Sequence, residues 1–517
     1  MITVSDGWKA AHTQTLLPET FIEVTYDITA QGVQDNVASA GSQEEPFSLA
    51  ETLVNELDKN SEKYGSVEWN HWGLDGGFEY YDESPVDPGY TTSSLSGYAA
   101  TYGTLPTITL TFSEIQTEAI PGITIVWCPV LNEWASRFRV TAYNGTTIVA
   151  QTTVTDNTAT TSQVFLEMQN YNKVVIEVLE WSLPYHRCRV VSVFVGIKVV
   201  LTKSDMIGFE QTESVDLLSA ALPKNAITVK LDNSDNRWNP DNPEGIARYI
   251  YERQEMRLRY GMTVNGVPEW IQGGTFWVSE WNAPNNGLEV TITARDAVEF
   301  MSEFYTGPRS GTLFAIAEAA FQQADIPHQT DDSARYDIDS NLTNLSVDFS
   351  GETQDYTIAQ ILQMVGHVGC CVLYQDKAGI IHLKPRETVA ADFTIESEIS
   401  YTHPEFEISK PLKAVSVDYG DNQKLTLSVA NTGEVQTVSN PLIKTQADAT
   451  RVANAARDLL INRKKISGEY RADPRADVLD IVTVESKYAA NTVILTDITY
   501  STTGGGLRGR FTGRVIG

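Results

Sequence analysis

Residues 215–243 read VDLLSAALPKNAITVKLDNSDNRWNPDNP, and IARYIYERQEMRLRYGMTVNGVPEWIQGGTFWVSEW follows at 246–281 and LEVTITARDAVEF at 288–300. Apolar residues alternate with polar ones in three runs, at Ile227, Val229 and Leu231, at Met256, Leu258 and Tyr260, and at Leu288, Val290 and Ile292. A period of two is typical of half-buried β-strands. Turn-forming pairs such as Asp232-Asn233 and Asn265-Gly266 separate the runs. The stretch therefore predicts a small antiparallel barrel.

The order of short motifs in this stretch is more specific than any one of them. After a leucine-rich strand come Leu222-Pro223, a strand ending in LDN, Trp238-Asn239-Pro240, a basic strand, and the pairs YG, NG, EW, GG and RD. This series resembles the first barrel of the phage tail hub family, the tail-tip or baseplate-hub proteins that cap the tail tube. Longer relatives carry tail-associated lysins. The resemblance continues through the C-terminal half of the chain.

Size and charge limit the function. A chain of 517 residues is long enough for roughly three to four domains. Its 67 acidic and 38 basic residues give a net charge of -29, which disfavours recognition of nucleic acid or an anionic membrane through basic patches. An acidic channel wall would still let DNA slide past without sticking. The N-terminus lacks a signal-peptide pattern and no long apolar run occurs, so we expect synthesis in the host cytoplasm and no membrane insertion.

We expect a mainly β fold with small α+β parts, divided into four regions. Residues 1–43 and 197–300 form the first hub barrel, which is discontinuous because residues 44–196 are inserted into it as a jelly-roll sandwich. Residues 301–398 form a small α+β domain. Here GTLFAIAEAAFQQA at 311–324 and YTIAQILQMVGHVGCCV at 356–372 predict helices, and a hairpin turns at 377–379. Residues 399–517 form the second hub barrel with one helix at 447–461.

The insertion has a second resemblance. Its Trp-x-Leu-Asp opening at 72–75, the run PTITLTF at 106–112 and the final strand RCRVVSVFVG at 187–196 resemble discoidin-like, galactose-binding jelly rolls. The module holds more aromatic rings than a sandwich core needs, and rings that stack on sugar faces are a usual means of carbohydrate binding. Trp127 and Trp181 lie on strands and are better explained as core. The candidates for carbohydrate binding lie in loop-like contexts: Trp69, Trp72, Tyr80, Tyr81 and Trp134.

No catalytic constellation stands out. The seven histidines show no metal or triad spacing, and no phosphate-loop glycine pattern occurs. Asp232, Ser234 and Asn236 imitate the start of a calcium loop, but Arg237 stands where the glycine is needed. Four cysteines are too few for a disulfide framework. We therefore predict no catalytic residue, no metal and no cofactor, although paired carboxylates for glycoside hydrolysis stay open in so acidic a chain.

The hub resemblance implies a virion structural protein of the tail tip or baseplate, and not an enzyme. It implies a homotrimer whose six barrels form a pseudo-sixfold ring that continues the tail tube. The implied partners are the distal tail protein, the C-terminus of the tape-measure protein and a spike or receptor-binding protein. The chain ends where the second barrel ends, which implies a hub without its own lysin. The inserted sandwich would bind host cell-wall glycan and serve host attachment. Two alternatives are a cell-surface glycan-binding adhesin and a glycoside hydrolase.

Overall fold

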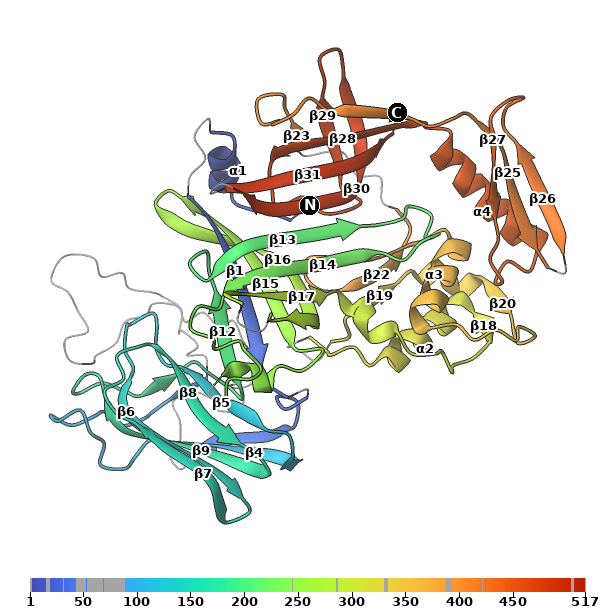
Figure 1. Ribbon diagram of the computed structural model, residues 1–517. Helices are drawn as coiled ribbons and strands as arrows, with labels where there is room; N and C mark the ends of the chain where they lie inside the picture. The colour runs from blue at the N-terminus through green and yellow to red at the C-terminus, as the bar shows by residue number, and fades with distance from the viewer. Residues whose placement is uncertain are drawn as a thin grey trace.

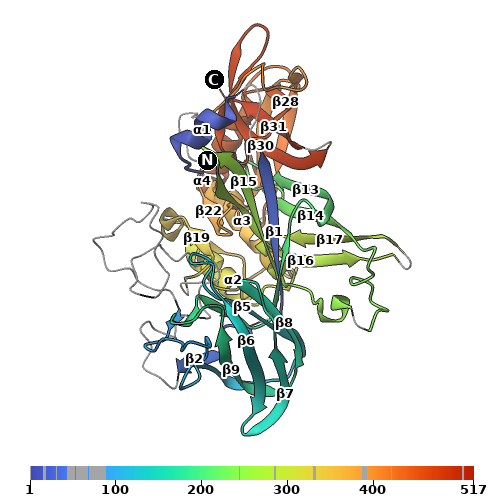
Figure 2. The same ribbon diagram turned by 90° about the vertical axis from the view of Figure 1, so that its left-hand side faces the viewer.

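The computed structural model describes residues 2–14, 19–30, 32–42, 53, 68, 89–243, 245–284, 287–329, 333–386, 393–420, 422–503 and 506–516. Strands dominate, which confirms the predicted mainly β fold class. The sandwich lies at one end of an elongated molecule, two strand-rich lobes follow it, and three of the helices gather on one side of the lobes (Figures 1 and 2). Among the described residues, no helix is long and apolar enough to cross a membrane.

One open sheet of 13 strands forms both lobes. The strands of the first lobe are β12 (Ile197–Leu201), β1 (Thr20–Ile28), β15 (Glu255–Val264), β16 (Val267–Asn282), β17 (Glu289–Arg295), β14 (Lys224–Asp232) and β13 (Met206–Ser214). Those of the second lobe are β30 (Ala490–Thr503), β31 (Gly506–Val515), β28 (Lys464–Arg471), β24 (Glu405–Ile408), β29 (Ile481–Glu485) and β23 (Thr394–Ile395). None of the described sheets closes on itself, so the two predicted barrels are two lobes of a continuous open sheet.

The lobes join where β13 pairs with β30. Five antiparallel residue pairs connect them, from Glu210 with Ser501 to Ser214 with Asp497. The alternation of apolar residues marks the face of each strand that is buried. Ile227, Val229 and Leu231 of β14 all point into a core that the first lobe shares with the second lobe. A short helix α1 (Asp6–His12) near the N-terminus adds Trp8 to the same core. The two lobes therefore share one hydrophobic interior.

The sandwich consists of two main sheets around its own core. One sheet has the order β2 (Val37–Ser42), β4 (Thr107–Gln116), β9 (Tyr171–Trp181), β6 (Ala135–Asn144) and β7 (Thr147–Val154). The other has the order β11 (Ser192–Phe194), β5 (Ile120–Val126) and β8 (Thr161–Met168), and β3 (Tyr90–Thr91) pairs with β10 (Arg189–Val190). An antiparallel two-sheet module of this kind is what the period-two runs of the insertion predict.

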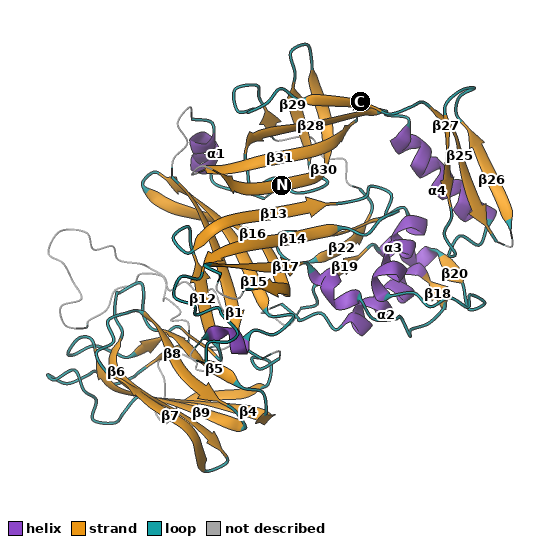
Figure 3. Cartoon of the chain, in the orientation of Figure 1, coloured by secondary structure: helices purple, strands orange, loops and turns teal. Residues whose placement is uncertain are grey.

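The helices surround a second core on one flank of the lobes (Figure 3). The helices here are α2 (Leu313–Ala324), α3 (Ile358–Gly369) and α4 (Gln446–Leu460), with 3-10 turns η3 (Ala297–Met301) and η4 (Ser340–Asn344). The small sheets are β19 (Tyr336–Ile338), β22 (Ile381–Lys384) and β21 (Val372–Gln375); β18 (Ser310–Thr312) and β20 (Ser346–Asp348); and β26 (Gln423–Ser428), β25 (Leu412–Tyr419) and β27 (Glu434–Val438). The three predicted helices and the predicted hairpin around Lys377 are confirmed.

Two elements pack against a different part of the molecule from the one to which the predicted domain bounds assign them. β2 falls within residues 1–43, yet it pairs with β4 of the sandwich. α4 and its sheet fall within residues 399–517, yet Val415, Val452 and Ala456 belong to the core of α2 and α3. Both elements have an apolar face that is buried against a neighbour distant in sequence, which a local pattern does not specify. The four-part domain division itself stays a prediction.

Asp296 gives this flank a pH dependence. It caps η3 by accepting from Val298 N, it is buried, and its Oδ2 has no donor among the described residues. Burial raises the pKa of Asp296 to about 7. Its contribution to stability is thus fully present below the unfolded-state pKa and is lost as pH rises through about 7. We expect the free energy of unfolding of Asp296→Asn, relative to that of the wild type, to rise by roughly 2–4 kcal/mol when the pH is raised from 5 to 8.5. Denaturant unfolding at both pH values measures this.

Asp348 is the control for that measurement. Two hydrogen bonds from Ser350, one from its hydroxyl and one from its backbone N–H, lower the pKa of this exposed carboxyl. Asp348→Asn should therefore leave the pH dependence between pH 5 and pH 8.5 unchanged, since an acid with a lowered pKa loses its stabilising effect only when the pH falls below the usual range of a carboxyl. A wild-type protein whose stability rises steadily from pH 5 to pH 8.5, unchanged by Asp296→Asn, would contradict the assignment.

Candidate functional site

Four of the five rings predicted to bind carbohydrate, Trp69, Trp72, Tyr80 and Tyr81, lie outside the described residues. The fifth, Trp134, is half-buried and packs against the core of the sandwich. Its backbone exchanges hydrogen bonds with Ser182, whose N–H donates to Trp134 O at 2.8 Å. The assignment of carbohydrate binding to these five rings stays a prediction.

Trp127 and Trp181 are core residues, as expected. Both are buried, and their rings meet edge to face with centroids 6.1 Å apart. Each indole N–H has a partner: Trp127 Nε1 donates to Ser162 Oγ at 2.8 Å, and Trp181 Nε1 donates to Glu133 Oε2 at 2.8 Å. Buried, satisfied indoles of this kind stabilise the sandwich and leave no ring face for a ligand.

A buried cluster of Glu68, Glu133 and His186 has metal-ligand geometry, since their donor atoms lie within 4.8 Å of one another. However, protein donors already fill the carboxylates. Arg189 makes a bidentate pair with Glu68 at 2.5 and 3.0 Å, and Trp181 donates to Glu133. His186 Nδ1 lies 2.8 Å from Glu133 Oε1. The cluster is therefore best explained as a paired ionic network that cross-links the sandwich. Sequence spacing could not have found it, because its members come from three separate segments.

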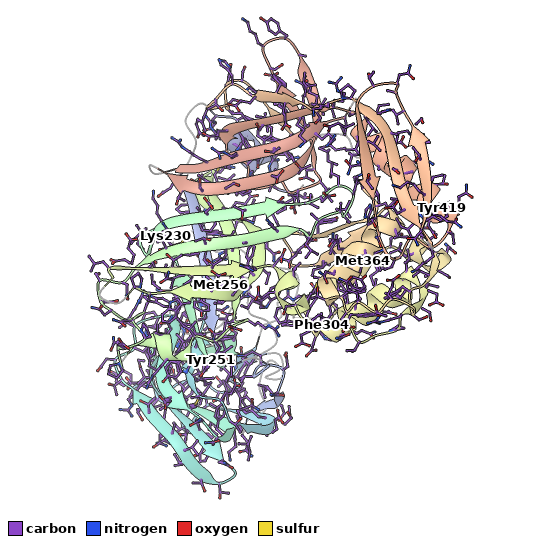
Figure 4. The ribbon with its side chains drawn as sticks, turned by 45° about the vertical axis from the view of Figure 1, so that its right-hand side comes forward. Lys230, Tyr251, Met256, Phe304, Met364 and Tyr419 are labelled. Atoms are coloured by element: carbon purple, nitrogen blue, oxygen red, sulfur yellow. The ribbon has the colours of Figure 1, made fainter. Side chains whose placement is uncertain are left out.

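A cavity of about 530 Å³ lies where the sandwich meets the first lobe. We call it the junction pocket. β8 of the sandwich forms one wall, and β12 with the segment 237–249 of the first lobe forms the other. Figure 4 labels Tyr251 at this end of the lobe, whereas Phe304, Met364 and Tyr419 lie towards the helical flank. The lining residues are Pro121, Gln163, Phe165, Leu166, Glu167, Val199, Val200, Asp205, Arg237, Trp238, Gly245, Ile246, Arg248 and Tyr249.

Hydrogen bonds and ion pairs tie the two walls of the junction pocket together. Tyr249, on the 3-10 turn η2 (Ile246–Tyr249), donates to Glu167 Oε2 at 2.6 Å, and Arg248 pairs with the same oxygen at 3.0 Å. The Arg248 guanidinium also lies 4.6 Å from the centre of the Tyr249 ring. Burial and the Glu167 carboxylate raise the pKa of Tyr249, so its hydroxyl remains a donor. The pocket is thus held open between two connected walls.

A second buried polar group lies between the lobes and the helical flank. Gln211 and Glu213 of β13 point into the core, and Tyr260 donates to Gln211 Oε1 at 2.5 Å. Lys377, from the hairpin between β21 and β22, is 2% exposed and donates to Pro474 O at 2.8 Å and to Ala476 O. It therefore connects the helical flank to the second lobe.

The charges of this group are coupled. Burial raises the pKa of Glu213 well above its usual range, while Lys377 opposes the shift. Burial likewise raises the pKa of Asp477, which shares a hydrogen bond with Glu213, and Lys377 again opposes the shift. One ammonium thus faces two carboxyls that contact each other, and a shared proton satisfies both. Sequence analysis missed the group, because a glutamate on a strand and a lysine in a turn ordinarily indicate positions that face solvent.

No protein-family model matches the chain, and no curated protein matches it. Among solved structures, the 43 kDa tail protein of prophage MuSo2 from Shewanella oneidensis aligns with a TM-score of 0.41 and 13% identity over 61% of this chain and 94% of that chain. The tail protein from Neisseria meningitidis MC58 gives 0.43 and 10% over 62% and 93%.

A third match is the E. coli c3393 protein, a component of the type VI secretion system, with a TM-score of 0.35 and 9% identity over 60% of this chain and 74% of that chain. All three matches are distant, with identities at or below 13%. Each alignment covers about three fifths of this chain, and all three TM-scores lie below 0.5.

Proposed function

We propose that this protein is a structural hub of a phage or phage-like tail tip or baseplate, which closes the tail tube and connects it to the spike or receptor-binding apparatus. The observation that carries the proposal is the union of two lobes in one open sheet through β13 and β30. Two linked lobes with a shared core give a rigid wall segment. Three such chains around one axis would present six lobes to a sixfold tube.

The free end of the sheet supports assembly with other chains. β24 is the last strand of the large sheet, and all four of its residues are exposed. Phe406 and Ile408 leave 44% and 66% of their surface in solvent. Exposed apolar edge strands are rare in monomeric proteins, because they pair with other chains. A neighbouring copy that covers β24 would bury both side chains.

In this proposal the role is structural rather than catalytic, and the protein resides in the virion. The homotrimer would contact the distal tail protein, the C-terminus of the tape-measure protein and a spike or receptor-binding protein. The sandwich, which extends from one end of the lobes, would lie on the outside of the ring, where host cell-wall glycan is accessible (Figure 2). The junction pocket favours a second candidate function, a glycan-binding adhesin in which the lobes serve as scaffold.

Light scattering and negative-stain imaging of the purified full chain test the hub proposal. We expect about three chain masses and threefold rings, and we expect Ile408→Asp to yield monomers, because a charge on the edge strand opposes pairing. Val267→Asp is the matched control, since Val267 has the same exposure of 66% on the hairpin of the first lobe. A wild-type monomer at all concentrations that also fails to join tail particles would contradict the proposal.

A further inference from the structure

The junction pocket has the composition of a ligand site rather than of a packing defect. Its volume lies within the range of small-molecule pockets, which is about 300–1,000 Å³. On the sandwich wall, the Phe165 ring leaves 63% of its surface in solvent, although it stands beside a cavity. An exposed ring at the mouth of a cavity offers a flat apolar face to a ligand.

The opposite wall supplies planar polar groups with hydrogen-bonding capacity. The Arg237 side chain is about half exposed and lies over Trp238, with the guanidinium carbon 5.5 Å from the ring centre. Thr202, through its N–H and hydroxyl, and the Ser204 hydroxyl all donate to Asp205 Oδ2. These bonds leave Oδ1 of Asp205 able to accept from a ligand. On the sandwich wall, the amide of Gln163 donates to Lys198 O at 2.6 Å, which fixes its orientation beside Phe165.

The charges around the cavity narrow the class of ligand. Two arginines, Arg237 and Arg248, and two carboxylates, Asp205 and Glu167, line the cavity, and Asp235 pairs with Arg237 at 3.6 Å, so the site has no net positive charge to attract a polyanion. The chain as a whole carries -29, which further opposes a phosphate-bearing polymer. Fixed donors and acceptors with one exposed ring suit a molecule that presents many hydroxyls on one side and C–H groups on another.

We infer that the junction pocket binds a neutral saccharide, with Phe165 stacking on a sugar face and Asp205 and Arg237 bonding to its hydroxyls. The inference deepens the proposed carbohydrate role and rests on it, but it moves the site. The ligand lies between the sandwich and the first lobe, and not on the five rings that the sequence favours. A bound saccharide would then contact both walls, so binding would stiffen the attachment of the sandwich to the hub.

The test uses the full chain on an array of neutral bacterial di- to tetrasaccharides, followed by titration calorimetry with the sugar that binds best. We expect Phe165→Ala to weaken binding at least about tenfold and Asp205→Asn to weaken it several-fold. Phe304→Ala is the matched control: Phe304 has the same 63% exposure but belongs to the helical flank, and its loss should leave affinity unchanged. Thermal unfolding checks that every variant is folded.

The outcomes separate the two ideas. If the wild type binds a neutral saccharide and Phe165→Ala and Asp205→Asn bind it equally well, the assignment of the binding site to the junction pocket is wrong while the carbohydrate role stands. Loss of binding in Trp134→Ala alone would return the site to the predicted rings. If the wild type binds no saccharide, or binds only inorganic polyphosphate or a peptide, both the carbohydrate role and the pocket inference are overturned, and the hub role is judged by its own mass measurement.

Discussion

Lys377→Met is expected to destabilise the full chain by roughly 3–5 kcal/mol, the range found when one member of a buried charged group is removed. Lys377 is the cation that opposes the burial shifts of Glu213 and Asp477. Its ammonium also donates to two backbone carbonyls in the segment that follows Asp473. Methionine fills the same space, so the loss reports on charge and hydrogen bonding. Denaturant unfolding, with hydrogen exchange of β13 and β30 as the local readout, measures it.

The pH dependence of this variant has a definite sign. Without the ammonium, burial raises the pKa values of Glu213 and Asp477 further, and stability that depends on their protonated forms is lost as pH rises through those values. The deficit of Lys377→Met should therefore be larger at pH 8.5 than at pH 5. Adding Glu213→Gln should recover part of it, because the pair is coupled. Lys424→Met, on the exposed strand β26, is the surface control and should cost less than about 0.5 kcal/mol.

Gly122→Ala is expected to disrupt the sandwich, at a cost of roughly 3–6 kcal/mol. Gly122 of β5 has a φ of 151°, which side-chain-bearing residues rarely adopt. A methyl group at this position would overlap Val164 O, and that atom is backbone that cannot rotate away. The residue pairs with Phe165 just after a register shift, so β8 would have to separate from β5. Hydrogen exchange of β5 and β8 in the full chain reports the separation.

The matched control is Gly41→Ala in β2 of the same module, where an added methyl group meets nothing within 4 Å. This variant should unfold within about 0.5 kcal/mol of the wild type. Because Phe165 and Glu167 follow Val164 on β8, Gly122→Ala should also abolish any ligand binding by the junction pocket while the lobes stay folded. Unchanged exchange in β8 of Gly122→Ala would show that the close approach is relieved at no cost.

The elements of the lobes were predictable because their burial repeats with a local period. The alternation at 227–231 and 256–260 marks β14 and β15, and the apolar face of 311–324 marks α2. Each pattern follows from one face meeting a core. The short helix α1 was not predicted, since seven residues hold too few turns to show a period. Its place is set by Trp8, which packs into the core from outside the sheet.

The polar interior was not predictable from sequence. On β13 the inward positions carry Phe209, Gln211 and Glu213, so the buried face of this strand is mostly polar and the usual alternation is inverted. Burial of these side chains depends on a lysine more than 150 positions away, a pairing that only tertiary structure supplies. The junction pocket is similar, because its walls come from β8 and from the segment 237–249, and neither wall alone suggests a ligand.

The pairing of β1 with β12 has a further consequence. Ile28, the last residue of β1, is the direct antiparallel neighbour of Ile197, the first residue of β12. The chain therefore leaves the lobe for the sandwich and returns from it at adjacent points. A segment with adjacent ends behaves as a cassette, because a recombination event could exchange it for a shorter turn or a different module while the sheet behind it keeps its register. The inserted module could then change from one lineage to another while the sheet that carries it stays the same.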